Sequence, residues 1–217
     1  MSVNIDEVEI DADRLSTNFV TSESKLEGNV ILRHQDMILR CGVAEIFPKS
    51  NHSEEPRYLL REQLALAQDT VDYSLSAQAG EALYLPTQDE LTLKQKVNFQ
   101  YKQASQSFYI EAENLQILLN DGMISRLVSS GSPSRFSQTF ADKTVVIEAA
   151  SINWIAETRV AILKDASLDD GATTFSASEI EYNTETGAIS AQGQGQDRPK
   201  YRFNNNNDEQ EQQNNDT

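Results

Sequence analysis

The chain has 217 residues, 38% of them hydrophobic, and 34 acidic against 18 basic residues give it a net charge of −16. A chain this acidic, with no basic cluster, is unsuited to nucleic acid, because it would repel the phosphates. No run approaches the roughly 20 apolar residues that a membrane-spanning helix needs. The first ten residues are acidic and strand-like, so no secretory signal is visible. The single cysteine, Cys41, excludes an internal disulfide.

Strands are predicted from the start of the chain, because apolar and polar residues alternate with a period of two. Residues 8–12 form the first strand, and residues 25–32 and 37–43 form the next two. Gly28 leaves a gap in the apolar face of its strand, where another backbone or a ligand could come close.

Residues 57–68 have helical propensity, since they are rich in leucine and poor in β-branched residues. Their place in the repeat of the sequence favours a strand instead. Leu64–Gln68 precedes Ala77 much as Ser134–Gln138 precedes Ala149, and tertiary context commonly overrides propensity.

The rest of the chain continues in strands and ends in a polar tail. The predicted strands cover residues 91–101, 108–119, 124–128, 135–138, 145–150, 160–168, 173–182, 188–192 and 198–203. Residues 204–217 are almost purely Asn, Gln, Asp and Glu, so we expect them to be disordered. We therefore predict a single all-β domain over residues 1–203.

An apolar-x-apolar-x-small pattern recurs along the whole chain. The small residue falls at positions 12, 41, 77, 112, 149 and 177, with intervals of 29, 36, 35, 37 and 28 residues. Repetition at this spacing indicates stacked β structure. If the two sheets of such a stack close, the apolar face is an ordinary core, and if they splay apart it is an exposed groove.

The sequence gives little support for a catalytic site or a metal site. With only His34 and His52 in the chain, a three-histidine metal site cannot form, and no cofactor is expected. Cys41 and His34 could be drawn as nucleophile and base, but Cys41 occupies the small apolar position of the repeat. The pairs Asp11/Asp13 and Asp169/Asp170 stand beside turns, where solvated surface is the simpler interpretation.

Three stretches resemble a known family. The first is Ile10-Asp-Ala-Asp13 followed by Leu26-Glu-Gly-Asn-Val30, and the second is Gly131-Ser-Pro-Ser-Arg-Phe-Ser-Gln138. The third runs from Ile147 through Trp154, Ala166–Leu168 and Ile180–Tyr182 to Arg198. Together they are similar to the LptA/OstA family, periplasmic proteins that carry lipopolysaccharide toward the outer membrane. The glycine-asparagine pair of the family is intact at Gly28-Asn29 but reads Lys164-Asp165 in the last repeat.

The resemblance implies an elongated, twisted antiparallel β-jellyroll that is open at both ends and binds the lipid A acyl chains in an apolar groove. It also implies a non-enzymatic periplasmic carrier whose partners are the jellyroll domains of inner- and outer-membrane transport components. Head-to-tail self-association would use edges near Val8, Ile10, Tyr201 and Phe203. By alternation, the predicted groove residues are Ile10, Ala12, Leu26, Val30, Leu39, Phe108, Ile110, Phe136, Ile147, Ala149, Val160, Ile162, Leu168 and Phe175.

Two alternatives stay open. One is another jellyroll of the same pathway, either the membrane-anchored partner or the periplasmic domain of the outer-membrane translocon. The other is a carbohydrate-active β-helix or sandwich enzyme that uses the aspartate pairs. Irregular repeat lengths and the lack of clustered Asp, Arg and Lys on one strand weigh against the enzyme.

Overall fold

The computed structural model describes residues 8–48, 55–104, 106–131, 133–140, 143–169, 173–193 and 198–203, and the predicted tail at 204–217 lies outside them. The described strands form one antiparallel sheet. Their bounds are β1 Glu9–Asp11, β2 Arg14–Thr17, β3 Ser24–His34, β4 Met37–Phe47, β5 Arg57–Asp69, β6 Ser74–Leu85, β7 Glu90–Gln103, β8 Gln106–Asn120, β9 Met123–Ser130, β10 Ser134–Phe140, β11 Lys143–Ala149, β12 Ser151–Ile155, β13 Val160–Asp169, β14 Thr173–Asn183, β15 Ile189–Gln192 and β16 Lys200–Phe203. A 3-10 turn, η1, covers Pro86–Gln88. No helix in the described ranges has the length and hydropathy to cross a bilayer.

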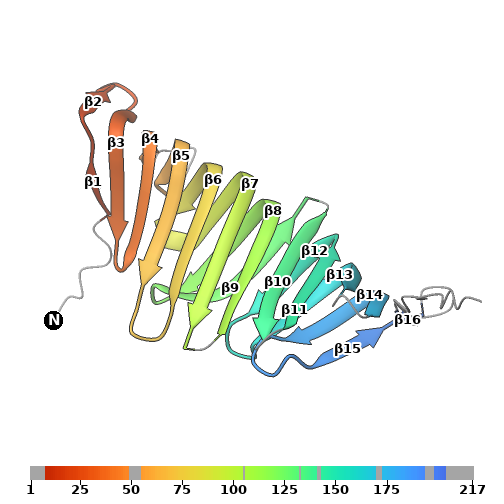
Figure 1. The fold of residues 1–217 in the computed structure, drawn as a ribbon. Helices are drawn as coiled ribbons and strands as arrows, with labels where there is room; N and C mark the ends of the chain where they lie inside the picture. The colour runs from red at the N-terminus through yellow and green to blue at the C-terminus, as the bar shows by residue number, and fades with distance from the viewer. Residues whose placement is uncertain are drawn as a thin grey trace, which may run out of the picture.

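The strands stack along the long axis of the molecule, from β1 at one end to β15 and β16 at the other (Figure 1). From β3 to β8 each strand pairs with the next one along the chain. Beyond β8 the sheet divides in two, because the first half of β8 pairs with β10 and its second half with β9. In the same way β13 pairs with both β12 and β11, and β14 with both β15 and β16.

We name the two halves limb A and limb B. Limb A consists of β1, residues 30–40, 64–78, 97–103 and 106–112, β10, β11, residues 166–169 and 173–177, and β16. Limb B consists of β2, residues 24–27, 43–47, 57–61, 81–94 and 114–122, β9, β12, residues 159–164 and 179–184, and β15. The long strands pass from one limb to the other, so the fold is a twisted jellyroll, as predicted.

Each long strand bends where the limbs meet. In β3 the register shifts between Glu27 and Val30, and the two looped-out residues, Gly28 and Asn29, have φ values of +79° and +44°. The pairs Glu62-Gln63 in β5 and Gln95-Lys96 in β7 bend in the same way. Positive φ favours glycine and asparagine, which explains the glycine-asparagine pair in β3.

The close approach predicted at Gly28 is made by the chain itself. A Cβ atom on Gly28 would lie 2.5 Å from Oδ2 of Asp13. The backbone N–H of Asp13 donates to the Gly28 carbonyl oxygen at 2.9 Å, and the Asn29 amide donates to Asp13 Oδ2 at 2.8 Å. Asp13 is therefore a structural residue of the bend.

Residues 57–68 form a strand, as their place in the repeat predicts. Leu60, Leu64 and Leu66 are buried against the core, whereas Arg61 and Glu62 at the bend are exposed. Pairing with β4 on one side and β6 on the other supplies the contacts that outweigh the helical propensity of the segment.

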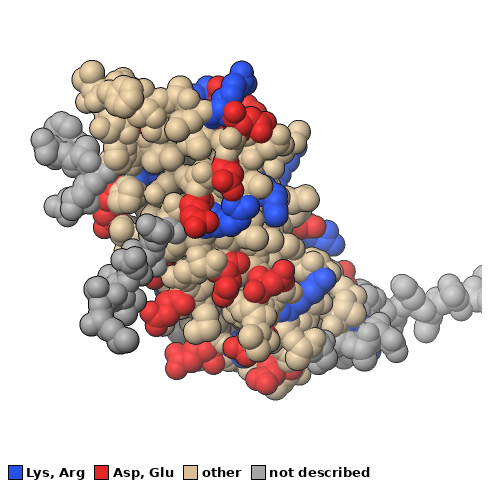
Figure 2. Space-filling view, turned by 90° about the vertical axis from the view of Figure 1, so that its left-hand side faces the viewer, with Lys and Arg blue, Asp and Glu red and all other residues tan. Residues whose placement is uncertain are grey.

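Charged side chains lie mainly on the outer faces. On the side seen in Figure 2, Lys and Arg side chains lie among Asp and Glu side chains. Arg61 shows the local pattern, since its guanidinium lies 3.0 Å from both Glu45 and Glu81. Such partly exposed pairs contribute little to stability, about 1 kcal/mol or less each.

Candidate functional site: an apolar row between the two limbs

One apolar row crosses limb A from end to end. Its members are linked by the register of successive strands, so that each lies beside the next on the face turned toward limb B. We call this set the inner row: Ile10, Leu32, Leu39, Leu66, Ala77, Phe99, Ile110, Phe136, Ile147, Leu168, Phe175 and Tyr201. The members from Leu32 to Leu168 are at most 4% exposed, whereas Tyr201 is 56% exposed. The row is thus buried in the middle and accessible at its ends.

The facing residues of limb B close the interior. Trp154 is fully buried, and its ring centroid lies 5.1 Å from those of Tyr101 and Phe108 in limb A. Phe136 likewise lies 5.4 Å from Tyr182 across the interior. In the middle of the molecule the limbs therefore seal against each other as a core, and apolar surface is left uncovered at the two ends, at Leu15, Ile189 and Tyr201.

The structure places most of the predicted groove residues on inward faces. Leu26, Val30, Leu39, Phe108, Ile110, Phe136, Ile147, Ala149 and Leu168 are buried, and Ile10, Ala12 and Phe175 are partly buried and packed against the core. Val160 and Ile162 are corrected, because their neighbours Ala161 and Leu163 are the fully buried residues of that part of β13. The prediction assumes that the same alternation of inward and outward residues holds before and after Lys164-Asp165. The strand bends there, and the alternation shifts by one residue.

The limbs also meet along a seam opposite the bends, and polar side chains join them there. Gln68 of limb A donates from Nε2 to the Gly122 carbonyl oxygen of limb B at 2.6 Å. The Tyr73 hydroxyl donates to Gln68 Oε1 at 3.2 Å and accepts from the backbone N–H of Ile124 at 2.8 Å. Burial raises the pKa of Tyr73, so this hydroxyl stays protonated and able to donate at neutral pH.

The same arrangement recurs further along the seam. Gln138 of limb A donates from Nε2 to the Thr184 carbonyl oxygen of limb B at 2.8 Å, and the Trp154 indole donates to Thr184 Oγ1 at 3.2 Å. The Arg159 guanidinium donates to Gln103 across the seam. His34 and Tyr84 form a further hydrogen bond between the limbs nearer the N-terminal end.

The seam was not predicted from the sequence, although a signal was present. Gln68 and Gln138 occupy inward positions, in phase with Leu66 and Phe136 respectively. A polar residue at an inward position near the end of a strand is expected to find a buried partner. The alignment of these two segments by the repeat therefore matches a shared structural role.

Catalytic arrangements do not form among the described residues. The Cys41 thiol donates to the Val43 carbonyl oxygen at 3.2 Å, whereas the His34 ring is bonded to Tyr84, so the two are not paired. Asp11 lies 2.5 Å from the Arg33 guanidinium. In the described part of the chain, no three His, Cys, Asp or Glu side chains gather in a way that could bind a metal ion.

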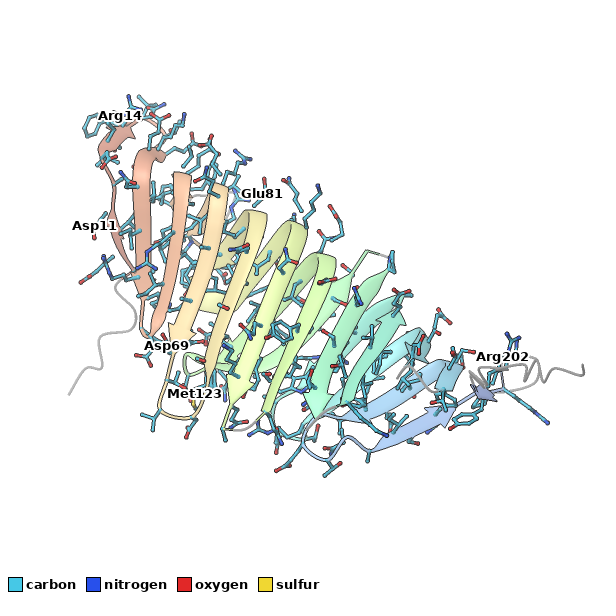
Figure 3. All side chains as sticks on the ribbon, viewed as in Figure 1. Asp11, Arg14, Asp69, Glu81, Met123 and Arg202 are labelled. Carbon is cyan, nitrogen blue, oxygen red and sulfur yellow. The ribbon has the colours of Figure 1, made fainter. Side chains whose placement is uncertain are left out.

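The predicted docking strands lie at the two ends of the sheet. β1 pairs with β3, and β16 pairs with β14, and neither has a second partner among the described strands. Asp11 and Arg202 mark these opposite ends (Figure 3). Exposed edges of this kind can accept a further strand.

Comparisons with known proteins agree with this architecture. A search of curated proteins returned no match. Among solved structures, the chain is similar to LptH, described as the LptA homologous periplasmic component of the lipopolysaccharide transport device from Pseudomonas aeruginosa. The TM-score is 0.51 at 17% identity, over 58% of this chain and 92% of LptH. The likeness confirms the jellyroll fold.

The family comparison covers nearly the whole of the described chain. The model of the family described as "LptA/(LptD N-terminal domain) LPS transport protein" matches residues 9–109 and again residues 101–188. The two matches overlap at residues 101–109, and the strands they contain belong to one continuous sheet. The chain therefore belongs to the LptA/LptD N-terminal domain family of lipopolysaccharide transport proteins.

Proposed function

We propose that this chain is a non-enzymatic carrier that shelters the acyl chains of lipopolysaccharide against the inner row during transport between the two membranes. The observation that carries the proposal is the inner row itself, an apolar path across twelve paired residues that is accessible at both ends of a family-typical jellyroll. By similarity to LptH, the location proposed is the periplasm.

The sealed interior requires that acyl chains enter at an end or that the limbs separate along the seam. An acyl chain gains about 0.8 kcal/mol per CH₂ that leaves water. Each seam hydrogen bond contributes roughly 0.5–1.5 kcal/mol net. Burial of one acyl chain could therefore offset the loss of a few of these hydrogen bonds. Apolar contacts between the limbs would be replaced by contacts of similar strength with the lipid.

Site-specific photo-crosslinking tests this proposal. Ile147→Asp is a poor test, because a charge at a fully buried position would unfold the chain. Phe175 is better suited, since it belongs to the inner row but is only partly buried. With a benzophenone amino acid at Phe175, the acyl portion of bound lipopolysaccharide should be labelled.

Thr174 provides the matched control, because it precedes Phe175 in β14 and points to the opposite face. A benzophenone at Thr174 should leave the acyl chains unlabelled. Equal labelling from both positions would show that the inner row is not the lipid path. So would the absence of labelling from both positions while lipopolysaccharide is bound.

We further propose that the ends dock head to tail, on a second copy or on jellyroll domains of the membrane components. Successive strands alternate in direction, so β1 of one molecule would add antiparallel to β16 of another. If the inner row continues across the junction, Ile10 faces Tyr201. On the outer face the same register sets Glu9 beside Arg202 and Asp11 beside Lys200, which gives two opposite-charge pairs.

A further inference from the structure

The outer face of limb A bears two adjoining hollows that the lipid path does not use. The first has a volume of about 370 Å³, and the second one of about 570 Å³. Asn98 and Glu111 line both of them, so the two hollows adjoin. Asn98 faces Glu111 in the register of β7 and β8, and both are exposed on the side opposite the inner row.

The first hollow has more apolar than polar surface, and its polar groups are nearly all uncharged. It contains three primary amides, two hydroxyl groups and one phenol, which belong to Gln78, Asn98, Gln100, Ser76, Ser137 and Tyr109. Glu111 is its one charged residue, and it lies 3.7 Å from Arg135, which lines the second hollow. Within a chain of net charge −16, this is a locally neutral surface.

An aromatic ring lies at the edge of this surface and is held by one hydrogen bond. Tyr109 is 45% exposed, and its hydroxyl accepts from Gln100 Nε2 at 2.5 Å. Ser76, Gln78 and Ser137 make no side-chain hydrogen bonds within the described residues. An oriented ring beside unused amide and hydroxyl groups can stack on a ligand while donating to it and accepting from it.

We infer that the first hollow is a binding site for an uncharged stretch of a linear oligosaccharide, whereas the second hollow, lined by Lys96, Glu113, Arg135 and Glu148, is charged. A sugar ring offers an apolar face for Tyr109 and vicinal hydroxyl groups for the amides. A phosphate-rich ligand is disfavoured, because the first hollow contains no Lys or Arg side chain. A protein partner is disfavoured as well, since its binding usually centres on buried apolar anchors and Tyr109 is the only exposed large apolar side chain of the first hollow.

The site lies on the face opposite the inner row, and the inference does not depend on the acyl chains binding there. Two sources could supply the sugar, namely the saccharide part of lipopolysaccharide and the glycan strands of the cell wall. Away from their charged groups, both present the same chemistry of linked pyranose rings with apolar faces and vicinal hydroxyl groups.

Titration with lipid-free saccharides tests the site. The intact chain is titrated, by calorimetry and by NMR, with oligosaccharide released from lipopolysaccharide and separately with soluble cell-wall glycan fragments. Binding of at least one, with shifts at Asn98, Gln100 and Tyr109, is the expected result, and the stronger ligand identifies the source. Tyr109→Ala and Gln78→Ala should each weaken binding by about tenfold or more, the loss expected for roughly 1.4 kcal/mol of contact.

Gln116→Ala is the matched control, because Gln116 lies half-buried on the outer face of β8 in limb B, away from both hollows. It should bind the saccharide like the parent chain. Failure of both saccharides to bind the parent chain, or undiminished binding by folded Tyr109→Ala, would overturn the inference. Either result would leave acyl-chain labelling from Phe175 unaffected, so it would not count against the proposed lipid path.

Discussion

At the scale of single residues, the bends of the long strands make the clearest demands on amino-acid type. Gly28 combines a φ of +79° with a contact to Asp13 that leaves no space for a Cβ atom. Asp165 occupies the equivalent bend of β13 at a φ of +47°, so glycine would relieve strain there. The two positions therefore predict substitutions of unequal effect, costly at Gly28 and nearly neutral at Asp165.

Gly28→Ala should destabilise the chain by about 1–3 kcal/mol, the range for a non-glycine residue forced into a strained conformation. Asp165→Gly should leave stability within about 1 kcal/mol of the parent. Urea unfolding followed by circular dichroism measures both. Equal stability of Gly28→Ala and the parent chain would contradict the close approach of Asp13.

Cys41 shows what burial does to a reactive group. Burial raises the pKa of its thiol from 9.0 to about 11, so the neutral form predominates at pH 8. Because the folded-state pKa is the higher one, this thiol contributes stability below about pH 9 and loses it as the pH rises toward 11. Alkylation by iodoacetamide at pH 8 should be far slower in the folded chain than in urea, and similar rates in the two states would show that Cys41 is accessible.

At the scale of elements, the seam rests on two glutamines that each satisfy a carbonyl of the opposite limb. Gln138→Ala removes the donor to the Thr184 carbonyl oxygen, and an unsatisfied buried group costs about 1–3 kcal/mol. For a chain of this size each kcal/mol lowers Tm by roughly 2–4 °C. Differential scanning calorimetry should therefore show Gln138→Ala melting below the parent, while Gln116→Ala melts with it.

The period-two alternation of the sequence was sufficient to predict the strands and most inward faces. It was insufficient at the bends. The number of residues that loop out, one or two, determines which of the following residues point inward. In β3 the inward residues Leu26 and Val30 are four positions apart, so the alternation is the same on both sides of the bend. In β13 the inward residues Leu163 and Ala166 are three positions apart, so the alternation shifts. The alternation of apolar and polar residues does not show how many residues loop out at a bend. It therefore predicts Val160 and Ile162 on the inner face of β13, whereas the structure places Ala161 and Leu163 there.

The candidate site was predictable only in part for a related reason. Alternation identifies the residues of the inner row, but whether the limbs seal or splay depends on which side chains meet across the interior. Trp154 contacts Tyr101 and Phe108 from strands more than forty residues away in the sequence. Such contacts leave no periodic signal.

At the scale of the whole molecule, the charge pattern of the two ends predicts how copies would join. Reversing both charges in Lys200→Glu/Arg202→Glu sets like charges beside Asp11 and Glu9 of the next copy. This should weaken head-to-tail association by about 1.4–2.8 kcal/mol, roughly 10- to 100-fold in Kd. Sedimentation velocity at low salt measures the change.

A reciprocal variant, Glu9→Arg/Asp11→Lys, serves as the control for this pairing. Mixed with the first variant, it should restore association between unlike chains, because the opposite charges then meet again. If the parent chain does not associate, or if the mixture associates no better than either variant alone, the proposed register is wrong.

The proposed function requires acyl chains to reach the interior between the limbs, and the single tryptophan of the chain reports on that space. Trp154 is fully buried there, and its indole is bonded to Thr184 of the seam. We expect lipopolysaccharide with brominated acyl chains to quench Trp154 fluorescence on binding, and the same lipid without bromine to leave it largely unquenched. Saturable binding of the brominated lipid with no quenching beyond that of the unbrominated one would show that the acyl chains do not reach the interior.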